Sequence, residues 1–226
     1  MDRVQKLLSN YGHCSRRMAE WLIEKKRVRV NGRIISLGFK AGDNDKITVD
    51  GKEIKRNDKI YLMLNKPVGY VTALRDDKLK TVMEFIKIKE RVFPIGRLDF
   101  NTSGLLLLTN DGDFANDVAH PSKEVKKTYL VELYNEITEK KIRRIVNGTM
   151  VDDRKTSPAE VKVLNENLFE ITIHEGRNRI VRKILKKLKL RVKTLKRIKI
   201  GKLELDKLGE GNCRMLDKKE IMSVFK

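Results

Sequence analysis

The chain has 226 residues, of which 51 are Lys or Arg and 31 are Asp or Glu, so its formal net charge is +20 at pH 7. A hydrophobic content of 40% is enough for a packed core and argues against a largely disordered chain. Apolar runs such as Leu105–Leu108 are the size of a strand and far below the roughly 20 residues that a membrane-spanning helix needs.

The charge excess indicates the class of partner. A chain with so many unbalanced cations repels itself, so a polyanion is expected to bind it, and nucleic acid is the commonest one. The first residues, MDRVQKLLSN, lack the apolar core of a signal peptide, and Cys14 and Cys213 stand far apart. We therefore expect a cytoplasmic protein with reduced cysteines and no membrane partner, and we expect it to act as a monomer.

The N-terminal segment predicts two short helices. Val4, Leu7, Leu8 and Tyr11 repeat at helical spacing, and the glycine that follows Tyr11 can end this helix. Ser15 is a candidate N-cap for a second helix. We expect the apolar face of the second helix to comprise Met18, Trp21 and Leu22.

Two hairpins follow these helices. Asn31-Gly32 and Asp50-Gly51 each lie between strand-like residues, and these dipeptides favour tight turns because both positions tolerate a positive φ. The polar stretch Lys55–Lys59 then interrupts the apolar pattern. We predict a small N-terminal domain at residues 1–58 and a larger domain at residues 59–226.

Basic residues crowd the small domain. Arg16 and Arg17 occupy the first turn of the second predicted helix, where the helix dipole disfavours cations. A solvated surface could explain one such pair, but the clustering favours a face that contacts RNA or DNA. The candidate contacts are Arg16, Arg17, Lys25, Lys26 and Arg29, with Arg27 and Arg33 nearby.

The larger domain mixes strand and helix patterns without an internal repeat, which predicts an α+β domain. Strands or strand ends are expected at residues 60–67, 91–96, 104–111, 128–133 and 168–176. Helices, or parts of helices, are expected at Val118–His120, Glu139–Val146 and Arg179–Leu188. Leu195, Ile198 and Ile200 have the spacing of another strand.

Residues 177–202 form a basic strip that contains no acidic residue. An apolar stripe of Val181, Ile184, Leu185 and Leu188 is expected to pack on the core. The cations around this stripe would repel one another if they were unpaired. A phosphate partner is therefore their expected purpose.

No metal or cofactor site is evident. His13, His120 and His174 are isolated, and neither cysteine has a partner at zinc-binding spacing. There is no phosphate-binding glycine loop, dinucleotide fingerprint or nucleophile elbow. We expect chemistry carried out by a carboxylate, a tyrosine and arginines, without a cofactor or metal.

Four segments carry a more specific signal. They are LNKPVGYVT at 64–72, GRLDFNTSGLLLLTNDG at 96–112, KKTYLVEL at 126–133 and EGRNRIVRKIL at 175–185. Their order and spacing resemble the pseudouridine synthases, in the branch of small-subunit synthase A and large-subunit synthase B that modifies ribosomal RNA. The N-terminal unit resembles the alpha-L RNA-binding domain. The resemblance implies an α+β fold, with this small domain preceding a catalytic domain built on a mixed, mainly antiparallel sheet.

The resemblance also implies roles for single residues. Asp99 would be the catalytic aspartate, Tyr129 would stack on the target base, and Arg182 would pair with Asp99, although the adjacent Arg97 could also do so. Lys127 is expected to be a solvated neighbour of Tyr129. The implied support and RNA contacts are Lys66, Tyr70, Arg97, Arg177, Asn178 and Arg179, with Pro67 and Gly69 completing the motif of Lys66. Two departures from the branch are Ile180, where glutamine is more usual, and Phe100, where tyrosine is frequent.

The implied reaction turns uridine into pseudouridine. The bond between ribose and N1 is broken, and C5 of the base is bonded to the same carbon. Asp99 could act as a nucleophile at that carbon or as a base at its neighbour. Either route needs a flipped-out nucleotide.

The expected substrate is ribosomal RNA, with the large subunit favoured. One alternative is a non-catalytic RNA-binding or ribosome-assembly factor on the same scaffold. A second alternative, a glycosidase with paired carboxylates, would need Asp111 or Asp113 beside Asp99.

Overall fold

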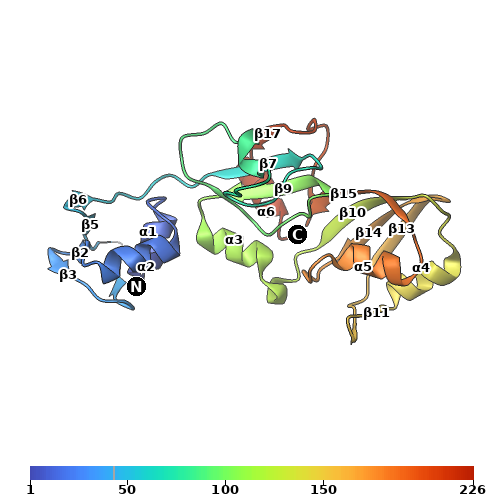
Figure 1. The fold of residues 1–226 in the computed structure, drawn as a ribbon, viewed down its shortest axis with the longest axis horizontal. Helices are drawn as coiled ribbons and strands as arrows, with labels where there is room; N and C mark the ends of the chain where they lie inside the picture. The colour runs from blue at the N-terminus through green and yellow to red at the C-terminus, as the bar shows by residue number, and fades with distance from the viewer. Residues whose placement is uncertain (43) are drawn as a thin grey trace. The chain divides into compact units, whose positions relative to one another are not determined.

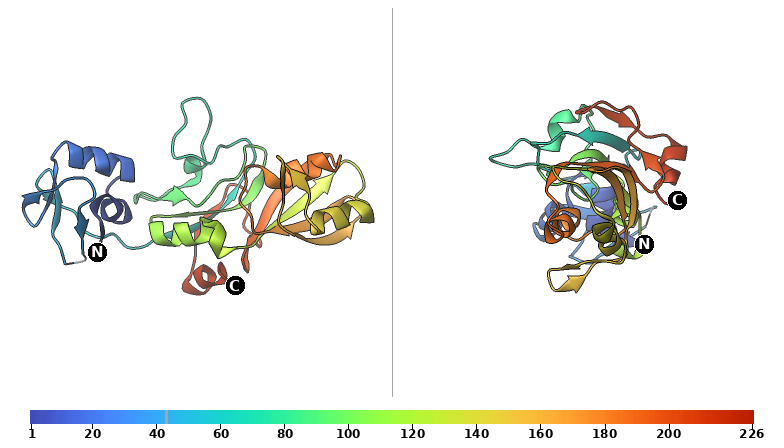
Figure 2. Two further views of the ribbon diagram at one scale, coloured as in Figure 1. Left: turned by 90° about the horizontal axis from the view of Figure 1, so that it is seen from below. Right: turned by 90° about the vertical axis from the view of Figure 1, so that its right-hand side faces the viewer.

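The computed structural model describes residues 1–42 and 44–226, which form two compact units. The first unit contains residues 1–60, 88–93 and 109–113. The second contains residues 61–87, 94–108 and 114–226. The ribbon is shown in Figure 1 and in two further views in Figure 2.

The first unit pairs two short helices with small antiparallel sheets (Figure 1). Strands β3, β2, β5 and β6 lie in that order in one sheet, and β1 pairs with β4. Both predicted tight turns are confirmed, because Asn31, Gly32, Asp50 and Gly51 have φ values of 51°, 80°, 51° and 78°. The elements are β1 Asp2–Arg3, α1 Val4–Asn10, α2 Arg16–Glu24, β2 Val28–Val30, β3 Arg33–Ile34, β4 Lys40–Ala41, β5 Ile47–Val49 and β6 Lys52–Glu53.

Helix α2 begins as predicted, since the Ser15 side chain accepts a hydrogen bond from the amide of Met18 at 3.2 Å. The predicted apolar face is partly wrong. Met18 and Trp21 are 49% and 44% exposed, and the face that packs on the core is Ala19, Leu22 and Ile23. Trp21 instead stacks under the Arg27 guanidinium, 5.5 Å from the ring centroid, so a cation–π contact covers its ring.

The second unit is built on one large sheet with the strand order β13-β14-β10-β15-β9-β7-β17. β16 pairs with β15 and β8 pairs with β9 beyond this path. The registered pairs are antiparallel except β9 with β15, so the expected mixed, mainly antiparallel sheet is confirmed. The strands are β7 Tyr61–Lys66, β8 Phe93–Pro94, β9 Ser103–Thr109, β10 Lys127–Leu133, β13 Glu160–Asn165, β14 Leu168–Ile173, β15 Val192–Ile200, β16 Leu203–Glu204 and β17 Cys213–Met215.

Two apolar clusters hold helices against this sheet. One joins α4 and α5 to β10, β14 and β15 through residues such as Ile145, Ile184 and Phe169. The other joins α3 to β7, β9 and the C-terminal segment through Phe114, Leu105 and others. The helical elements and the small hairpin are η1 Val82–Phe85, α3 Gly112–Ala119, η2 Pro121–Lys123, α4 Glu139–Val146, β11 Met150–Val151, β12 Arg154–Lys155, α5 Ile180–Lys187 and α6 Lys218–Ser223.

The helical segment predicted at Val118–His120 is confirmed for Val118 and Ala119 and wrong for His120. Its real counterpart, α3, begins six residues earlier at Gly112 and ends at Ala119, and His120 instead caps η2. The sequence pattern missed this start because Asn110, Asp111 and Gly112 form a turn signal at the end of the strand-like run, and Gly112, a poor helix former, is the first residue of the helix. In contrast, α4 has the predicted bounds, and α5 lies within the predicted range.

The parallel contact between β9 and β15 requires a glycine. Gly104 faces Arg197 in the register, and its φ is +105°. A Cβ atom at this position would lie 2.2 Å from the carbonyl oxygen of Arg197, so no other residue fits without separating the strands. The contact between these strands brings the loop of Asp99 and the strand residue Arg197 to the same cavity.

Among the described residues, every helix is too short or too polar to span a membrane.

Candidate active site

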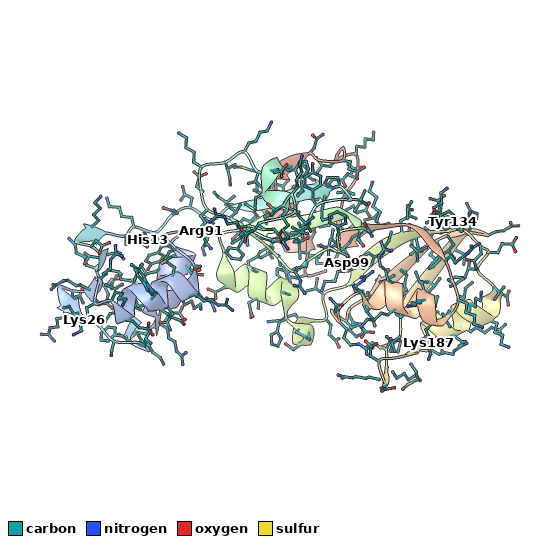
Figure 3. The ribbon with its side chains drawn as sticks, in the orientation of Figure 1. His13, Lys26, Arg91, Asp99, Tyr134 and Lys187 are labelled. Atoms are coloured by element: carbon teal, nitrogen blue, oxygen red, sulfur yellow. The ribbon has the colours of Figure 1, made fainter. Side chains whose placement is uncertain are left out.

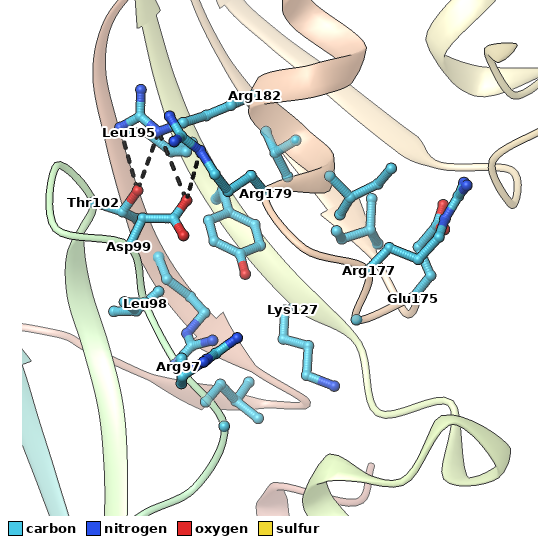
Figure 4. A pocket seen from close by; sticks show the side chains of 18 of the residues that line it. Arg97, Leu98, Asp99, Thr102, Lys127, Glu175, Arg177, Arg179, Arg182 and Leu195 are labelled. Atoms are coloured by element: carbon cyan, nitrogen blue, oxygen red, sulfur yellow. Dashed lines mark hydrogen bonds and ion pairs between the residues drawn. The ribbon is translucent and has the colours of Figure 1, made fainter. Parts of the chain in front are cut away.

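The second unit contains a cavity of about 190 Å³. Its wall comes from the loop before β9, from β10 and β15, and from the start of α5 (Figure 4). The three residues expected to carry catalysis all line it, although they lie 30 and 53 positions apart in sequence: Asp99, Tyr129 and Arg182. The fold therefore brings the expected catalytic group together.

Two guanidinium groups flank the carboxylate of Asp99. Its Oδ2 lies 3.9 Å from Nε of Arg179 and 4.0 Å from Nε of Arg182 (Figure 4). Arg179 has a left-handed φ of 53° and stands directly before α5, whose first turn carries Arg182. Burial lowers the pKa of Arg182, while the charge of Asp99 opposes this shift. Arg97, the alternative partner, lines the cavity but lies beyond 4.0 Å of any carboxylate oxygen in the described residues.

The loop that carries Asp99 is held in place through the carbonyl oxygens of its backbone. Every carbonyl oxygen from Leu98 to Thr102 accepts a hydrogen bond. The donors are the Thr72 hydroxyl, the Lys66 ammonium, the Gly69 amide, the Thr102 amide and the Arg182 guanidinium. Since a loop with all its acceptors satisfied has few ways to move, the carboxylate is held in one place.

Lys66 is the centre of this support. Its side chain is 0% exposed, and its ammonium donates to the carbonyl oxygens of Pro67, Asp99 and Thr102 at 2.9, 3.2 and 2.9 Å. Burial lowers its pKa to about 8, against the opposing charges of Asp99 and Glu210. A group with no exposed surface has no access to RNA. The expected direct contact of Lys66 with RNA is therefore replaced by an internal position under the loop.

Other expected contacts lie outside the cavity. Tyr70 packs edge-on against Phe85, with ring centroids 4.7 Å apart, and it does not line the wall. Asn178 is exposed at the surface but is not part of the wall either. Ile180 is buried in the wall, where its apolar side chain packs on the α5 cluster. Phe100 points to solvent, and only its carbonyl oxygen is used.

Arg177 lines the cavity but is bound internally. Its Nε donates to Glu175 at 2.6 Å, and its other nitrogens donate to carbonyl oxygens of Val151, Arg154 and Lys155. These bonds anchor the β11–β12 hairpin beside the cavity. The sequence could not show this, because the hairpin and Arg177 are more than 20 positions apart.

Part of the basic strip is paired, which corrects the expectation of a wholly unpaired strip. Acidic residues from other elements pair with it: Asp152 with Lys183, Glu132 with Lys193 at 2.7 Å, and Glu204 with Lys199 at 2.7 Å. Lys127, expected to be solvated, also lines the cavity, and its pKa is lowered to about 8 by burial and by the charge of Arg197. Arg197 itself is buried in the wall, and no local pattern distinguished it within the strip.

The five candidate RNA contacts of the first unit are exposed. Arg16, Arg17, Lys25, Lys26 and Arg29 all lie at its surface, as Figure 3 shows for Lys26. Arg29 also donates to the carbonyl oxygen of Gly32 at 3.1 Å.

The carboxylates expected to partner Asp99 in a glycosidase lie outside the cavity wall. The second acid in that wall, Glu175, is instead paired with Arg177 at 2.6 Å. Asp111 pairs with Lys59 at 3.1 Å and Asp113 with Lys6 at 2.8 Å, and neither lines the cavity. No group of three or more His, Cys, Asp or Glu residues in the described part of the chain is arranged to hold a metal ion.

Comparison with known proteins agrees with this geometry. Residues 60–187 match a family model described as RNA pseudouridylate synthase, and residues 2–47 match that of the S4 domain. A Bacillus subtilis (strain 168) protein named ribosomal large subunit pseudouridine synthase B is 41% identical over 98% of this chain and 94% of its own. The dual-specificity RNA pseudouridine synthase RluF of Escherichia coli (strain K12) is 34% identical over 99% of this chain and 78% of its own.

One solved structure is similar over the whole length. A crystal structure of pseudouridylate synthase superimposes with a TM-score of 0.74 at 30% identity, covering 99% of this chain and 100% of its own. The synthase model spans more than half of the chain, and the relatives span nearly all of it. The chain therefore belongs to the RNA pseudouridylate synthase family and carries an S4 domain at its N-terminus.

Proposed function

We propose that this chain isomerises a specific uridine of ribosomal RNA, with large-subunit RNA favoured, and that Asp99 is its reacting carboxylate. The relative from Bacillus subtilis is named for the large ribosomal subunit, which supports this substrate. The observation that carries the proposal is the carboxylate of Asp99 within 4.0 Å of two guanidinium groups at a cavity of about 190 Å³. A cavity of about 150 Å³ already holds a benzene ring, so a pyrimidine base fits.

Arg179 and Arg182 stabilise the negative charge that Asp99 needs at the ribose. The carboxylate then either attacks the anomeric carbon or removes a proton from the neighbouring carbon. Both routes break the bond to N1. The fixed loop supplies the positional accuracy that such a step demands.

The target base reaches Asp99 only when its nucleotide is flipped out of the RNA, at a cost of a few kcal/mol. Tyr129 lines the cavity on β10 and stacks on the inserted base. Stacking of a base on an aromatic ring contributes about 1–3 kcal/mol, which offsets part of the flipping cost. The exposed arginines and lysines of the S4 domain hold the surrounding RNA through its phosphates.

We further propose that the protein acts as a monomer in the cytoplasm. Its net charge of +20 opposes self-association of free copies, and the RNA that neutralises this charge is cytoplasmic in the proposed role. Light scattering of the free protein tests the oligomeric state, and a dimer mass would contradict it.

The experiment maps pseudouridine in ribosomal RNA after incubation with the wild-type protein and with Asp99→Asn. Carbodiimide-dependent stops of reverse transcriptase mark each new pseudouridine. We expect one or a few new stops with the wild type and none with Asp99→Asn, which keeps the side-chain size and removes only the negative charge. RNA affinity should stay within about twofold, because the RNA phosphates are held elsewhere.

Two outcomes would reject the proposal. The first is no new stop with the wild type on naked RNA, on fragments or on assembly intermediates, which would favour a non-catalytic RNA-binding factor. The second is a comparable rate with Asp99→Asn, which would remove Asp99 from the reaction.

A further inference from the structure

Lys127 and Arg197 are two cations of the cavity wall that lie outside the pair of arginines beside Asp99. Lys127 is on β10 and Arg197 is on β15, where it lies directly opposite Tyr129 in the register. Lys127 is two residues before Tyr129, so both side chains project from the same face of the sheet. Figure 4 shows Lys127 on the side of the cavity away from Arg179 and Arg182.

Arg197 is buried with hydrogen-bonding capacity left over. Only 5% of the residue is exposed, and its Nε donates to the carbonyl oxygen of Leu105 at 2.7 Å. Its Nη2 is buried and has no hydrogen-bond partner in the described residues. A buried donor of this kind is destabilising unless an acceptor arrives, so it calls for a ligand oxygen.

The ammonium group of Lys127 also has few hydrogen-bond acceptors and no anionic partner among the described residues. Its ammonium makes one long hydrogen bond, to the carbonyl oxygen of Val118 at 3.5 Å, and no carboxylate of the described chain pairs with it. Burial and the nearby charge of Arg197 lower its pKa to about 8. Two adjacent cations without an acid repel each other, and an anionic ligand between them relieves this repulsion.

We propose that Lys127 and Arg197 bind the carbonyl oxygens of the target uracil and stabilise the negative charge that this base carries after its bond to the ribose breaks. The inference rests on the proposed function. The occupant is the base and not a phosphate because the buried groups lie on the strand face that also carries Tyr129, where a stacked base rests. A phosphate stays tethered between two nucleotides and remains near the rim.

The negative charge on the uracil arises by either of the two routes proposed for Asp99. If Asp99 attacks the anomeric carbon, a bond from its oxygen to that carbon forms and the bond to N1 breaks. If Asp99 instead removes the neighbouring proton, a carbon–carbon double bond forms in the sugar as the bond to N1 breaks. In both cases the electron pair stays on the base. The resulting uracil anion spreads its charge over N1, O2 and O4.

The same two cations serve the second half of the reaction. To present C5, the base turns over about its N3–C6 axis, which exchanges N1 with C5 and O2 with O4. A donor that held O2 before the turn therefore holds O4 after it. When C5 bonds to the sugar carbon, the bond from Asp99 to that carbon breaks in the first route, and Asp99 returns its proton to the neighbouring carbon in the second. The charge of the base is consumed, and the C5 proton then leaves to solvent or to a base.

The test measures single-turnover release of tritium from C5 of the target uridine. We expect Lys127→Met to lower this rate about 100-fold, the typical loss when one donor to a developing oxyanion is removed. Affinity for RNA and its salt dependence should stay unchanged, and Lys127→Arg should recover most of the rate. Lys126→Met is the matched control, because Lys126 is exposed and pairs with Glu160.

RNA with 2-thiouridine or 4-thiouridine at the target gives a second measurement, since sulfur accepts hydrogen bonds weakly. We expect thio substitution to slow the wild type more than it slows Lys127→Met, because the variant has already lost the contact. Equal slowing of both proteins would overturn the inference. Weaker RNA binding with a shallower salt slope in Lys127→Met would also overturn it, by assigning Lys127 to a phosphate. An inactive wild type would instead reject the proposed function itself.

Discussion

Replacing Lys66 with methionine tests whether the buried ammonium positions Asp99. The variant keeps the length of the side chain but removes three hydrogen bonds, two to carbonyl oxygens of the Asp99 loop and one to that of Pro67. The carbonyl oxygen of Asp99 keeps the Thr102 amide as a donor at 3.0 Å, so those of Pro67 and Thr102 lose most. Two buried acceptors without partners cost about 2–6 kcal/mol at about 1–3 kcal/mol each.

Removing the ammonium also has a benefit for stability. Burial lowers its pKa from 10.5 to about 8, which corresponds to a penalty of about 3 kcal/mol that the variant no longer carries. The two effects largely offset each other, and we expect a change in the free energy of unfolding between a gain of about 1 kcal/mol and a loss of about 3 kcal/mol. The position of Asp99 has no such compensation, and a displacement of about 1 Å can cost about 100-fold in kcat.

The assay combines single-turnover tritium release with urea unfolding and RNA binding. We expect Lys66→Met to be folded, to bind RNA like the wild type, and to react about 100-fold more slowly. Lys78→Met is the control, because Lys78 is exposed and its side chain has no partner within the described residues. A folded Lys66→Met with a rate within threefold of the wild type would refute the reasoning. A loss of RNA affinity would show instead that Lys66 contributes to RNA binding.

Two further predictions concern the sheet and the S4 domain. Gly104→Ala should lower the free energy of unfolding by more than about 3 kcal/mol, because the new Cβ would lie 2.2 Å from the carbonyl oxygen of Arg197. Urea unfolding measures this loss, and an unchanged midpoint would contradict the prediction. Replacing Arg16 and Arg17 together with alanine should weaken RNA binding and make the slope of log K against log salt shallower by about 1–2, as measured by fluorescence anisotropy. An unchanged slope would remove these arginines from the RNA contact.

The support of the Asp99 loop explains why three separated segments occur together. The segment 64–72 supplies Lys66, Gly69 and Thr72, each of which donates to a carbonyl oxygen of the loop. The start of α5 supplies Arg182, which donates to the carbonyl oxygen of Asn101 and lies 4.0 Å from the carboxylate. Changes in any of these segments therefore act on the position of one carboxylate.

Local signals in the sequence were sufficient for the turns and for several elements. Asn31-Gly32 and Asp50-Gly51 form the predicted tight turns, because these residue types tolerate the positive φ values that such turns need. Helix α4 also has its predicted bounds. The family motifs also identified Asp99, Tyr129 and Arg182, which the fold brings to one cavity. These features could be predicted because each depends on residues that are neighbours in the sequence or on a motif of consecutive residues.

Pairing over long distances could not be read in the same way. The basic strip looked unpaired because its acidic partners, such as Asp152 and Glu132, lie on other elements. Whether Lys66 supports the site or contacts RNA could not be decided from the sequence, because no local pattern shows that a lysine is fully buried. Local sequence predicted the strands and the charges. Only the packing of β9, β10, β15 and α5 around the cavity decided which cations reach it, because burial and electrostatic partners arise from the tertiary fold.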